Sequence, residues 1–235
     1  MKMLLRNRAW REHVASDMLI NGIMDKDKQT RKKLLDSAKR EFTEKGYMKA
    51  SLRSICRDAG LTTGAIYFFF KDKEELFQSV VGEALLALDK AIGTHFGEEE
   101  DFSGDVNSIT PEDLQDDFKA ALEILSVLYR YRDEFLLVME KASGSGYENM
   151  IDRYVEYIYE HYLRLYCRMK GYGSRKKLTA EDRFIVHWMS HDQIEIFIHL
   201  LTHCGSEKEA AKQMKNMFNY MVGGWIATMK KEIIS

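Results

Sequence analysis

Residues 51–77 read SLRSICRDAGLTTGAIYFFFKDKEELF, and this stretch decides how the N-terminal part of the chain folds. Two short helical patterns, over 51–59 and 62–68, meet at a turn centred on Gly60. Glycine is suited to such a turn because it adopts a positive φ without steric cost. Two helices joined in this way are typical of a helix-turn-helix, in which the second helix enters the major groove of DNA.

The second helix carries residues that suit close contact with a nucleic acid. Thr62 is its expected N-cap, and Thr63 is placed to reach a base edge or a phosphate. Gly64 lacks bulk, so the helix can approach the groove closely. Tyr67 can donate its hydroxyl to a phosphate, and Lys73 adds a positive charge beside the amides that begin the next helix, a natural phosphate site.

With the helix before it, this stretch closely resembles the N-terminal DNA-binding domain of the tetracycline-repressor (TetR) family. In that family a Tyr-x-His-Phe segment follows, with a lysine three residues on; here Tyr67, Phe70 and Lys73 match, and Phe69 replaces the histidine. The resemblance covers about 30–77. It implies DNA contacts by Ser51, Thr62, Thr63, Gly64, Tyr67 and Lys73. It also implies a regulator, most often a repressor, that binds a palindromic operator as a dimer and is released by a small molecule.

The alternative is a helical small-molecule- or metal-binding protein whose N-terminal helices only pack together. A bare helix-turn-helix pattern does not separate these two interpretations, since motif matches include false positives. The turn, Gly64, Tyr67, Phe70 and Lys73 occur together at the family's spacing, which favours DNA binding.

Composition predicts an all-α protein. The chain has 235 residues and one proline, Pro111, with 45% hydrophobic and 31% charged residues, so it can build a real core. The expected helices cover about 30–45, 51–59, 62–68, 72–94, 111–130, 131–141, 147–170, 179–203 and 207–232. The expected domains are an N-terminal extension over 1–28, a three-helix DNA-binding domain over 29–78, and a helical regulatory, ligand-binding and dimerisation domain over 79–235.

Charge is unevenly distributed along the chain. The formal net charge is −2, yet residues 28–77 hold 12 Lys or Arg against 7 Asp or Glu, and residues 78–235 hold 18 against 26. A basic module joined to an acidic body is compatible with double-stranded DNA as a partner at one end only.

Several other classes of protein are disfavoured. No apolar run approaches the roughly 18–20 residues of a membrane span, and residues 1–28 lack the apolar stretch of a signal peptide. Three widely spaced cysteines suit free thiols in the cytoplasm. Neither a nucleotide-binding glycine motif nor a nucleophile elbow is present, so we expect no enzyme, no catalytic residues and no cofactor.

Histidines on the C-terminal part raise the question of a metal site. His187 and His191 are four residues apart, as are His199 and His203 beside Cys204. This spacing can bring two imidazoles to one metal ion. The first pair lacks an obvious third ligand, so we expect no metal.

The last two helices are candidates for dimerisation, which the TetR resemblance also implies. Residues 194–201, IEIFIHLL, are apolar nearly all round, which suits a helix buried on two sides. Residues 207–232 place methionines and aromatics along one stripe. The alternative is the core of a monomer. The predicted interface residues are Ile194, Phe197, Met214, Phe218, Met221 and Trp225.

A ligand pocket is expected on the middle helices. Aromatic and methionine side chains there favour a flat apolar or cationic ligand, although such stripes are also typical of an ordinary core. The candidate lining residues are Tyr129, Phe135, Met139, Tyr154, Tyr157, Tyr162 and His187.

Overall fold

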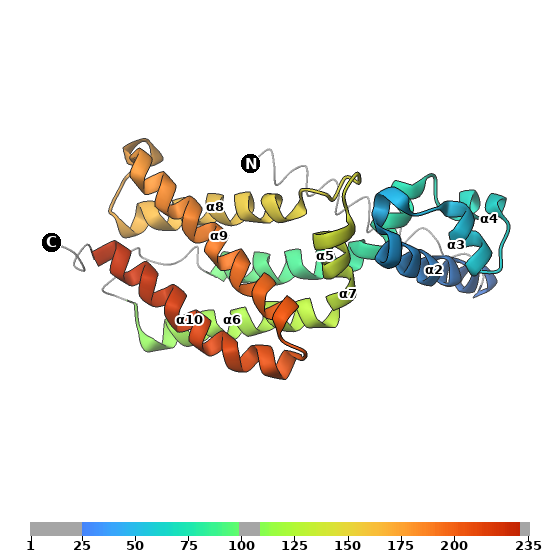
Figure 1. Cartoon of the computed structure of the whole chain (residues 1–235). Helices are drawn as coiled ribbons and strands as arrows, with labels where there is room; N and C mark the ends of the chain where they lie inside the picture. Colours follow the sequence, from blue (N-terminus) through green and yellow to red (C-terminus); the bar gives the residue numbers. More distant parts are fainter. Residues whose placement is uncertain (1–24, 99–108, 231–235) are drawn as a thin grey trace. The chain divides into compact units, whose positions relative to one another are not determined.

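The computed structural model describes residues 25–98 and 109–230 (Figure 1). Within these ranges the chain forms α-helices and one short 3-10 helix, and no strand, which confirms the all-α prediction. The helices are α2 (Asp25–Lys49), α3 (Leu52–Asp58), α4 (Thr63–Phe69), α5 (Lys73–Glu98), α6 (Pro111–Arg130), α7 (Arg132–Lys141), α8 (Met150–Met169), η3 (Arg175–Lys177), α9 (Ala180–His203) and α10 (Glu207–Lys230).

The helices agree with the predicted ones, and the largest differences lie at the ends of α2 and α5. Most of the predicted extension over 1–28 lies outside the described residues, and its last residues already belong to α2. Gly46 interrupts α2 with a φ of 73°, where the sequence predicts a helix end. Thr110 and Thr179 begin α6 and α9 with reciprocal capping boxes, so local signals set these boundaries.

The chain divides into two compact units. Unit 1 contains residues 1–87 and 133–148, and unit 2 contains residues 88–132 and 149–235. The sequence places the boundary at 78/79 and assigns everything after it to one domain. In the structure the division falls further along α5, and the segment 133–148 packs with the N-terminal helices.

Polar contacts explain why the segment 133–148 belongs to unit 1. The Lys39 ammonium on α2 lies 3.0 Å from a carboxylate oxygen of Asp133 and 2.8 Å from one of Glu134. The backbone N–H of Gly146 donates to the Glu74 carboxylate over 2.8 Å. These partners are far apart in sequence, so no local pattern predicts them.

The core of unit 1 is built around Phe77, which is fully buried. Its ring meets Phe42 edge-on at a centroid distance of 5.0 Å and Tyr47 at 5.2 Å. Tyr147, from the segment 133–148, lies at 5.8 Å. Buried residues from each of the first four described helices complete this core: Leu34, Ala38, Ile55, Cys56, Ile66 and Leu76.

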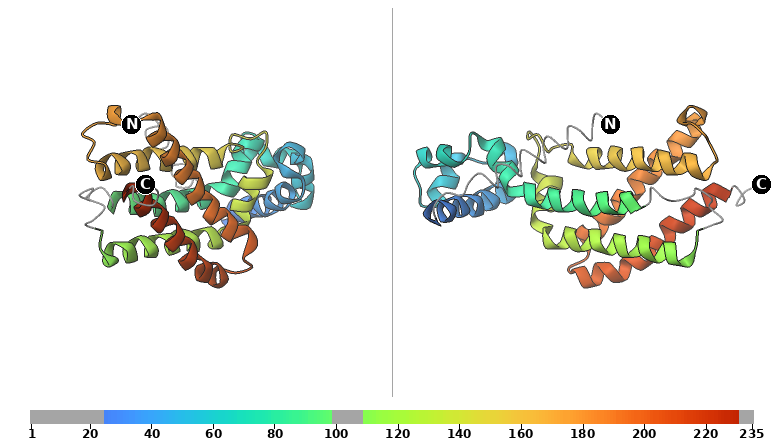
Figure 2. Two further views of the ribbon diagram at one scale, coloured as in Figure 1. Left: turned by 60° about the vertical axis from the view of Figure 1, so that its left-hand side comes forward. Right: turned by 180° about the vertical axis from the view of Figure 1, so that it is seen from behind.

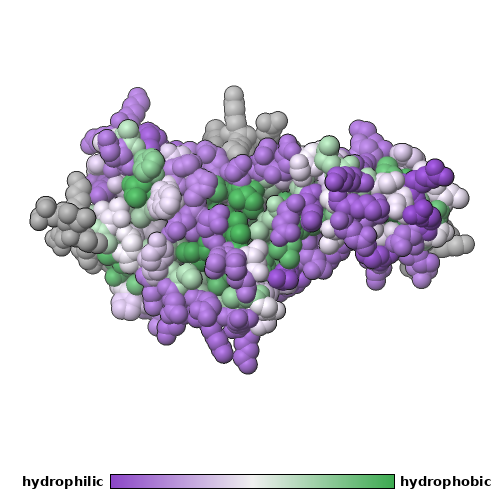
Figure 3. Space-filling model, in the orientation of Figure 1, coloured by the Kyte–Doolittle hydropathy of each residue, from purple (hydrophilic) through white to green (hydrophobic). Residues whose placement is uncertain are grey.

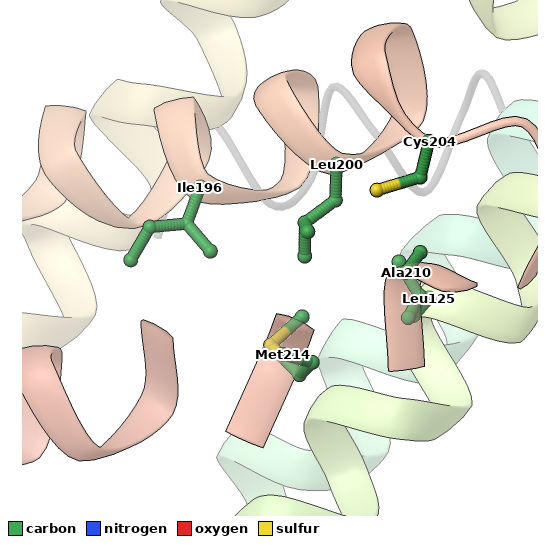
Figure 4. Packing of buried hydrophobic residues seen from close by; sticks show 6 residues of the cluster. All are labelled: Leu125, Ile196, Leu200, Cys204, Ala210 and Met214. Atoms are coloured by element: carbon green, nitrogen blue, oxygen red, sulfur yellow. The ribbon is translucent and has the colours of Figure 1, made fainter. Parts of the chain in front are cut away.

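The core of unit 2 lies between α6, α9 and α10, and α8 packs along α9 (Figure 2). Figure 4 shows its central cluster, in which side chains from the three helices and the α9–α10 connection point toward one another: Leu125, Ile196, Leu200, Cys204, Ala210 and Met214. All three cysteines are free and buried. No helix in the described parts is long and apolar enough to cross a membrane.

Candidate nucleic-acid interface

The turn between α3 and α4 is a Schellman motif. Gly60 has a φ of 71°, its N–H donates to the Arg57 carbonyl over 3.1 Å, and the Leu61 N–H donates to the Cys56 carbonyl over 2.8 Å. This pair of bonds satisfies carbonyls at the end of α3 and requires a residue that tolerates positive φ. The sequence prediction for Gly60 is therefore confirmed.

Two side chains anchor α4, and the opposite face of the helix is open. Ile66 and Phe70 are 1% and 2% exposed. Because 3.6 residues make a turn, Gly64 and Phe68 lie opposite Ile66, and Thr63 and Tyr67 lie one turn apart along the flank of that face. All four are exposed: Thr63, Gly64, Tyr67 and Phe68.

The structure brings the predicted contact residues of α3 and α4 to the surface. Ser51, Thr62, Thr63, Gly64 and Tyr67 are all exposed. The Ser51 hydroxyl caps α3 by accepting from the Ser54 N–H, whereas the Thr62 side chain makes no capping hydrogen bond. Thr62 keeps the N-cap position, and its hydroxyl is available for another partner. DNA contact by these residues stays a prediction.

Lys73 is placed differently from the other predicted contacts. Its ammonium donates to the Tyr47 carbonyl over 2.8 Å and to the Met48 carbonyl over 3.4 Å, and it lies 4.4 Å from the centre of the Tyr47 ring. The side chain thus ties the start of α5 to the end of α2. An ammonium has three N–H donors, so one remains for a phosphate, but the main contacts of Lys73 are internal.

Polar side chains of α2 hold α3 in place through hydrogen bonds and an ion pair. The buried Glu41 carboxylate accepts from the Ser51 backbone N–H over 3.1 Å, and the Ser37 hydroxyl donates to Asp58 over 2.7 Å. Arg40 also pairs with Asp58, and its guanidinium, together with the Ser37 hydroxyl, lowers the pKa of that carboxyl. These contacts fix both ends of α3 against α2, so α3 and the turn hold α4 in one orientation.

The motif analysis did not single out several exposed residues near this surface. Arg53 and Arg57 lie exposed on α3, and Lys49 and Lys71 are exposed at the adjoining helix ends. The excess of basic residues over 28–77 is the sequence signal that could have found them. Phe68, exposed next to Tyr67 on α4, is likewise not among the predicted contact residues.

Known proteins match the N-terminal part of the chain, which contains this surface. The model of the bacterial regulatory proteins of the tetR family matches residues 34–80, which contain α3, the turn, α4 and the start of α5. Residues 34–80 therefore carry the DNA-binding region of the TetR family. The prediction made from Tyr67, Phe70 and Lys73 is therefore confirmed.

Two curated relatives match the same region of the chain. It is 45% identical over 56 residues to the transcriptional repressor BepR of Brucella suis biovar 1 (strain 1330), which is 24% of this chain and 27% of that protein. It is 46% identical over 52 residues to the transcriptional regulator AcrR of Shigella flexneri, which is 22% of this chain and 24% of that protein. The chain thus spans about a quarter of these relatives' length. Both relatives are named as regulators rather than enzymes.

The fold of the chain also resembles a solved structure. NalD of Pseudomonas aeruginosa, the secondary repressor of the MexAB-OprM multidrug efflux pump, matches with a TM-score of 0.53 and 18% identity, over 83% of this chain and 97% of that one. At this identity the match supports the fold alone. It supports an N-terminal helix-turn-helix followed by a helical domain.

Unit 2 contains a cavity of about 570 Å³. Its apolar wall comes mainly from α6, α9 and α10 and includes Ile124, Ile196, Phe197, Met214, Phe218 and Trp225. Gln193 lines it too; its side chain is 9% exposed, and its Oε1 is buried without a hydrogen-bond partner. Three carboxylates, Asp113, Asp116 and Asp117, also line the cavity together with His95, and no lysine or arginine among the described residues does.

Most of the predicted pocket residues lie away from this cavity, and the ligand pocket stays a prediction. Only Tyr162 lines the cavity. Phe135 and Met139 belong to unit 1, because the segment 133–148 packs there. His187 is exposed on α9, with its ring 4.7 Å from that of His191.

The three remaining tyrosines of the predicted pocket have structural partners within unit 2. Tyr129 donates to the carbonyls of Leu200 and Cys204 over 2.8 and 3.0 Å, which closes the end of α9. Tyr154 donates to Asp89 over 3.0 Å, and the Tyr157 ring lies 5.6 Å from that of Phe96. They fasten helices together instead of lining the cavity.

The predicted dimer interface also stays a prediction, and most of its residues pack inside the single chain. Met214, Phe218 and Trp225 are 2%, 7% and 9% exposed within a single chain, and Trp225 meets Tyr162 edge-on at 4.9 Å. Phe197 and Met221 pack against the same core, and Ile194 is half-buried. The stripe of α10 therefore faces the interior of its own unit.

The outer side of α9 and α10 carries a different set of residues. Phe184 and Trp188 on α9 are 73% and 59% exposed, and Tyr220 on α10 is 63% exposed. Gly223 and Gly224 are exposed on α10 as well. The space-filling view shows hydrophobic patches among hydrophilic side chains over unit 2 (Figure 3). We refer to Phe184, Trp188, Tyr220, Gly223 and Gly224 as the outer face.

The histidine pairs do not form a larger ligand set. The rings of His199 and His203 stack at 4.0 Å on the exposed side of α9. Across the described residues, no group of three or more His, Cys, Asp or Glu side chains is placed to hold a metal ion.

Proposed function

We propose that this protein is a transcriptional regulator of the TetR family, acting as a repressor, that binds a palindromic operator as a homodimer and is released by a small molecule. The observation that carries the proposal is the open face of α4. It is held in place by Ile66 and Phe70 and sits in a basic unit that matches the family model. Binding to the cell's own DNA places the protein in the cytoplasm.

The alternative, a helical binding protein whose N-terminal helices have no DNA role, explains the open face of α4 less well. A purely structural helix would gain by burying large aromatic side chains. Tyr67 and Phe68 instead remain 59% and 70% exposed, beside the exposed arginines of α3. Exposed aromatic and basic groups around a small glycine suit the groove and phosphates of a duplex.

Selection of binding sites from random duplex DNA by the full chain tests the function. We expect a palindromic consensus whose affinity falls as salt rises, because phosphate contacts release counterions. Replacing Tyr67 with phenylalanine should weaken operator binding about threefold to tenfold, as expected for one lost hydrogen bond, and leave thermal unfolding unchanged.

Tyr172→Phe is the matched control, since it removes a hydroxyl from a half-buried tyrosine of unit 2. It should bind the operator like the parent chain. A parent chain that enriches no sequence would contradict the regulator proposal. Equal affinity of Tyr67→Phe and the parent chain would remove the Tyr67 hydroxyl from the interface.

The cavity of unit 2 is the proposed effector site. Its volume lies within the roughly 300–1,000 Å³ of small-molecule sites, and its wall of methionine and aromatic side chains suits a flat apolar body. Asp116 is paired with Lys119 over 2.6 Å, so the surplus of negative charge in the lining comes from Asp113 and Asp117, and it favours a cation over an anion. The unpartnered Gln193 Oε1 would accept a hydrogen bond from the ligand.

Two probes with one aromatic body and opposite charges test the effector proposal. We expect 1-naphthylmethylammonium to bind at least about tenfold more tightly than 1-naphthylacetate by calorimetry, and to lower operator affinity. Gln193→Leu should weaken the ammonium probe by removing the acceptor. Equal or tighter binding of the carboxylate would contradict the proposed charge preference.

The outer face is the proposed dimer contact. It exposes two large aromatic side chains on α9, and Gly223 and Gly224 on α10 leave room for close approach of a second helix. Two helices from each subunit would form an isologous four-helix contact, as a two-fold axis requires. A palindromic operator in turn requires such an axis.

A further inference from the structure

Phe68 is the most exposed large apolar side chain among the described residues of unit 1, at 70%. Single exposed apolar residues are common and need no explanation by themselves. The position of Phe68 is what matters, because it shares the open face of α4 with Gly64, and Thr63 and Tyr67 flank that face. Its ring meets Phe69 edge-on at 5.0 Å with an interplanar angle of 84°, which restricts its orientation.

Gly64 leaves an open space beside this ring. Residues four apart on a helix are neighbours on one face, and helical side chains lean toward the N-terminus. The Phe68 side chain therefore leans toward the turn that contains Gly64. A Cβ built on Gly64 would meet nothing within 4 Å. Together the glycine backbone and the Phe68 ring form an apolar recess, which we call the Gly64–Phe68 notch.

We propose that the Gly64–Phe68 notch receives the C5 methyl group of a thymine, so that Phe68 reads thymine at one position of each operator half-site. This inference rests on the proposed function. A phenyl ring has no hydrogen-bonding group, so it cannot read the donors and acceptors of a base edge. The thymine methyl is the apolar group that the major groove presents, and phenylalanine is among the residues that contact it.

The neighbours of Phe68 have complementary chemistry. Thr63 and Tyr67 carry hydroxyls on the flank of the open face, which can serve polar base edges and phosphates. A bulkier residue at position 64 would fill the notch. The apolar contact of Phe68 therefore adds sequence information that hydroxyl groups bound to phosphate cannot provide.

Substitution of thymine by uracil tests the proposal, because it removes the methyl group and keeps every donor and acceptor. The operator is first selected with the full chain, and each thymine of a half-site is then replaced by deoxyuridine. We expect one position to lose affinity about fourfold, the effect of one buried methyl group, and about fifteenfold when both half-sites are changed.

Variants of Phe68 test whether this side chain is the one that distinguishes thymine from uracil. Phe68→Ala should bind the thymine operator more weakly than the parent chain and should no longer distinguish uracil from thymine at that position. Phe68→Leu should keep part of the discrimination, since it retains apolar surface. Met48→Ala is the matched control: Met48 is 67% exposed in the same unit but lies on α2, so discrimination should remain intact.

The results with these operators and variants either support or overturn the thymine proposal. If Phe68→Ala weakens the thymine and uracil operators by the same factor at every position, the ring acts as a wedge or a general contact, and the thymine proposal is overturned. Absence of any uracil-sensitive position overturns it too while leaving the regulator proposal intact. Failure of the parent chain to select any operator overturns both. Unchanged thermal unfolding of Phe68→Ala shows that the fold is preserved.

Discussion

Replacing Gly64 with alanine is expected to stabilise unit 1 and at the same time to weaken DNA binding by about 10- to 100-fold, or about 1.4 to 2.7 kcal/mol. Gly64 lies within α4 and does not have a positive φ, so alanine fits its backbone and raises helix stability by about 0.5–1 kcal/mol. The new methyl group meets no protein atom within 4 Å. It projects from the open face of α4 and would hold the helix away from the groove.

Gly93→Ala is the matched control for Gly64→Ala. Gly93 is an exposed glycine within α5, and a Cβ there also meets nothing within 4 Å. Urea unfolding should show a gain in stability for both variants, whereas only Gly64→Ala should lose operator affinity. Operator binding by Gly64→Ala at the parent's affinity would show that α4 does not approach DNA closely.

A glutamate at Phe184 or Trp188 is expected to convert the dimer to a folded monomer and to abolish measurable operator binding. Both side chains are exposed in the single chain, so the change leaves the core of unit 2 untouched. In a dimer each variant would bury an unpaired carboxylate on both sides of the two-fold axis, at a cost of several kcal/mol per ion. A monomer keeps one half-site contact, which is far weaker than two linked ones.

Trp225→Glu provides the contrast. Trp225 is 9% exposed and packs on Tyr162, so a charge there should unfold unit 2 instead of separating subunits. Light scattering gives the mass of each variant, and circular dichroism shows whether it is folded. Arg130→Glu, an exposed change on α6, should remain a dimer. Dimers of undiminished stability for both Phe184→Glu and Trp188→Glu would mean that the outer face is not the interface.

The sequence by itself determined the elements and the DNA-binding motif, because their signals are local. Thr110 and Thr179 cap their helices through residues three positions away, and Gly60 is needed for a turn of positive φ. The anchoring of α4 follows from the spacing of Ile66 and Phe70. Helix boundaries, the buried side of α4 and the family resemblance all depend on such short-range relations.

Only the tertiary structure decided which surface each apolar stripe covers. The stripe of α10 that contains Met214, Phe218 and Trp225 has the pattern of a buried face, and that pattern is the same whether the covering helix comes from its own chain or from a partner. The structure shows that it covers the core of unit 2.

Contacts between residues far apart in the sequence could not be predicted from it either. Lys39 meets Asp133 and Glu134, and Lys73 meets the Tyr47 carbonyl, although nothing in the local pattern of either lysine specifies these partners. They place the segment 133–148 in unit 1 and turn Lys73 inward. Hydrophobic periodicity indicates which side of a helix is buried. The partner of a given side chain depends on how the helices pack in three dimensions.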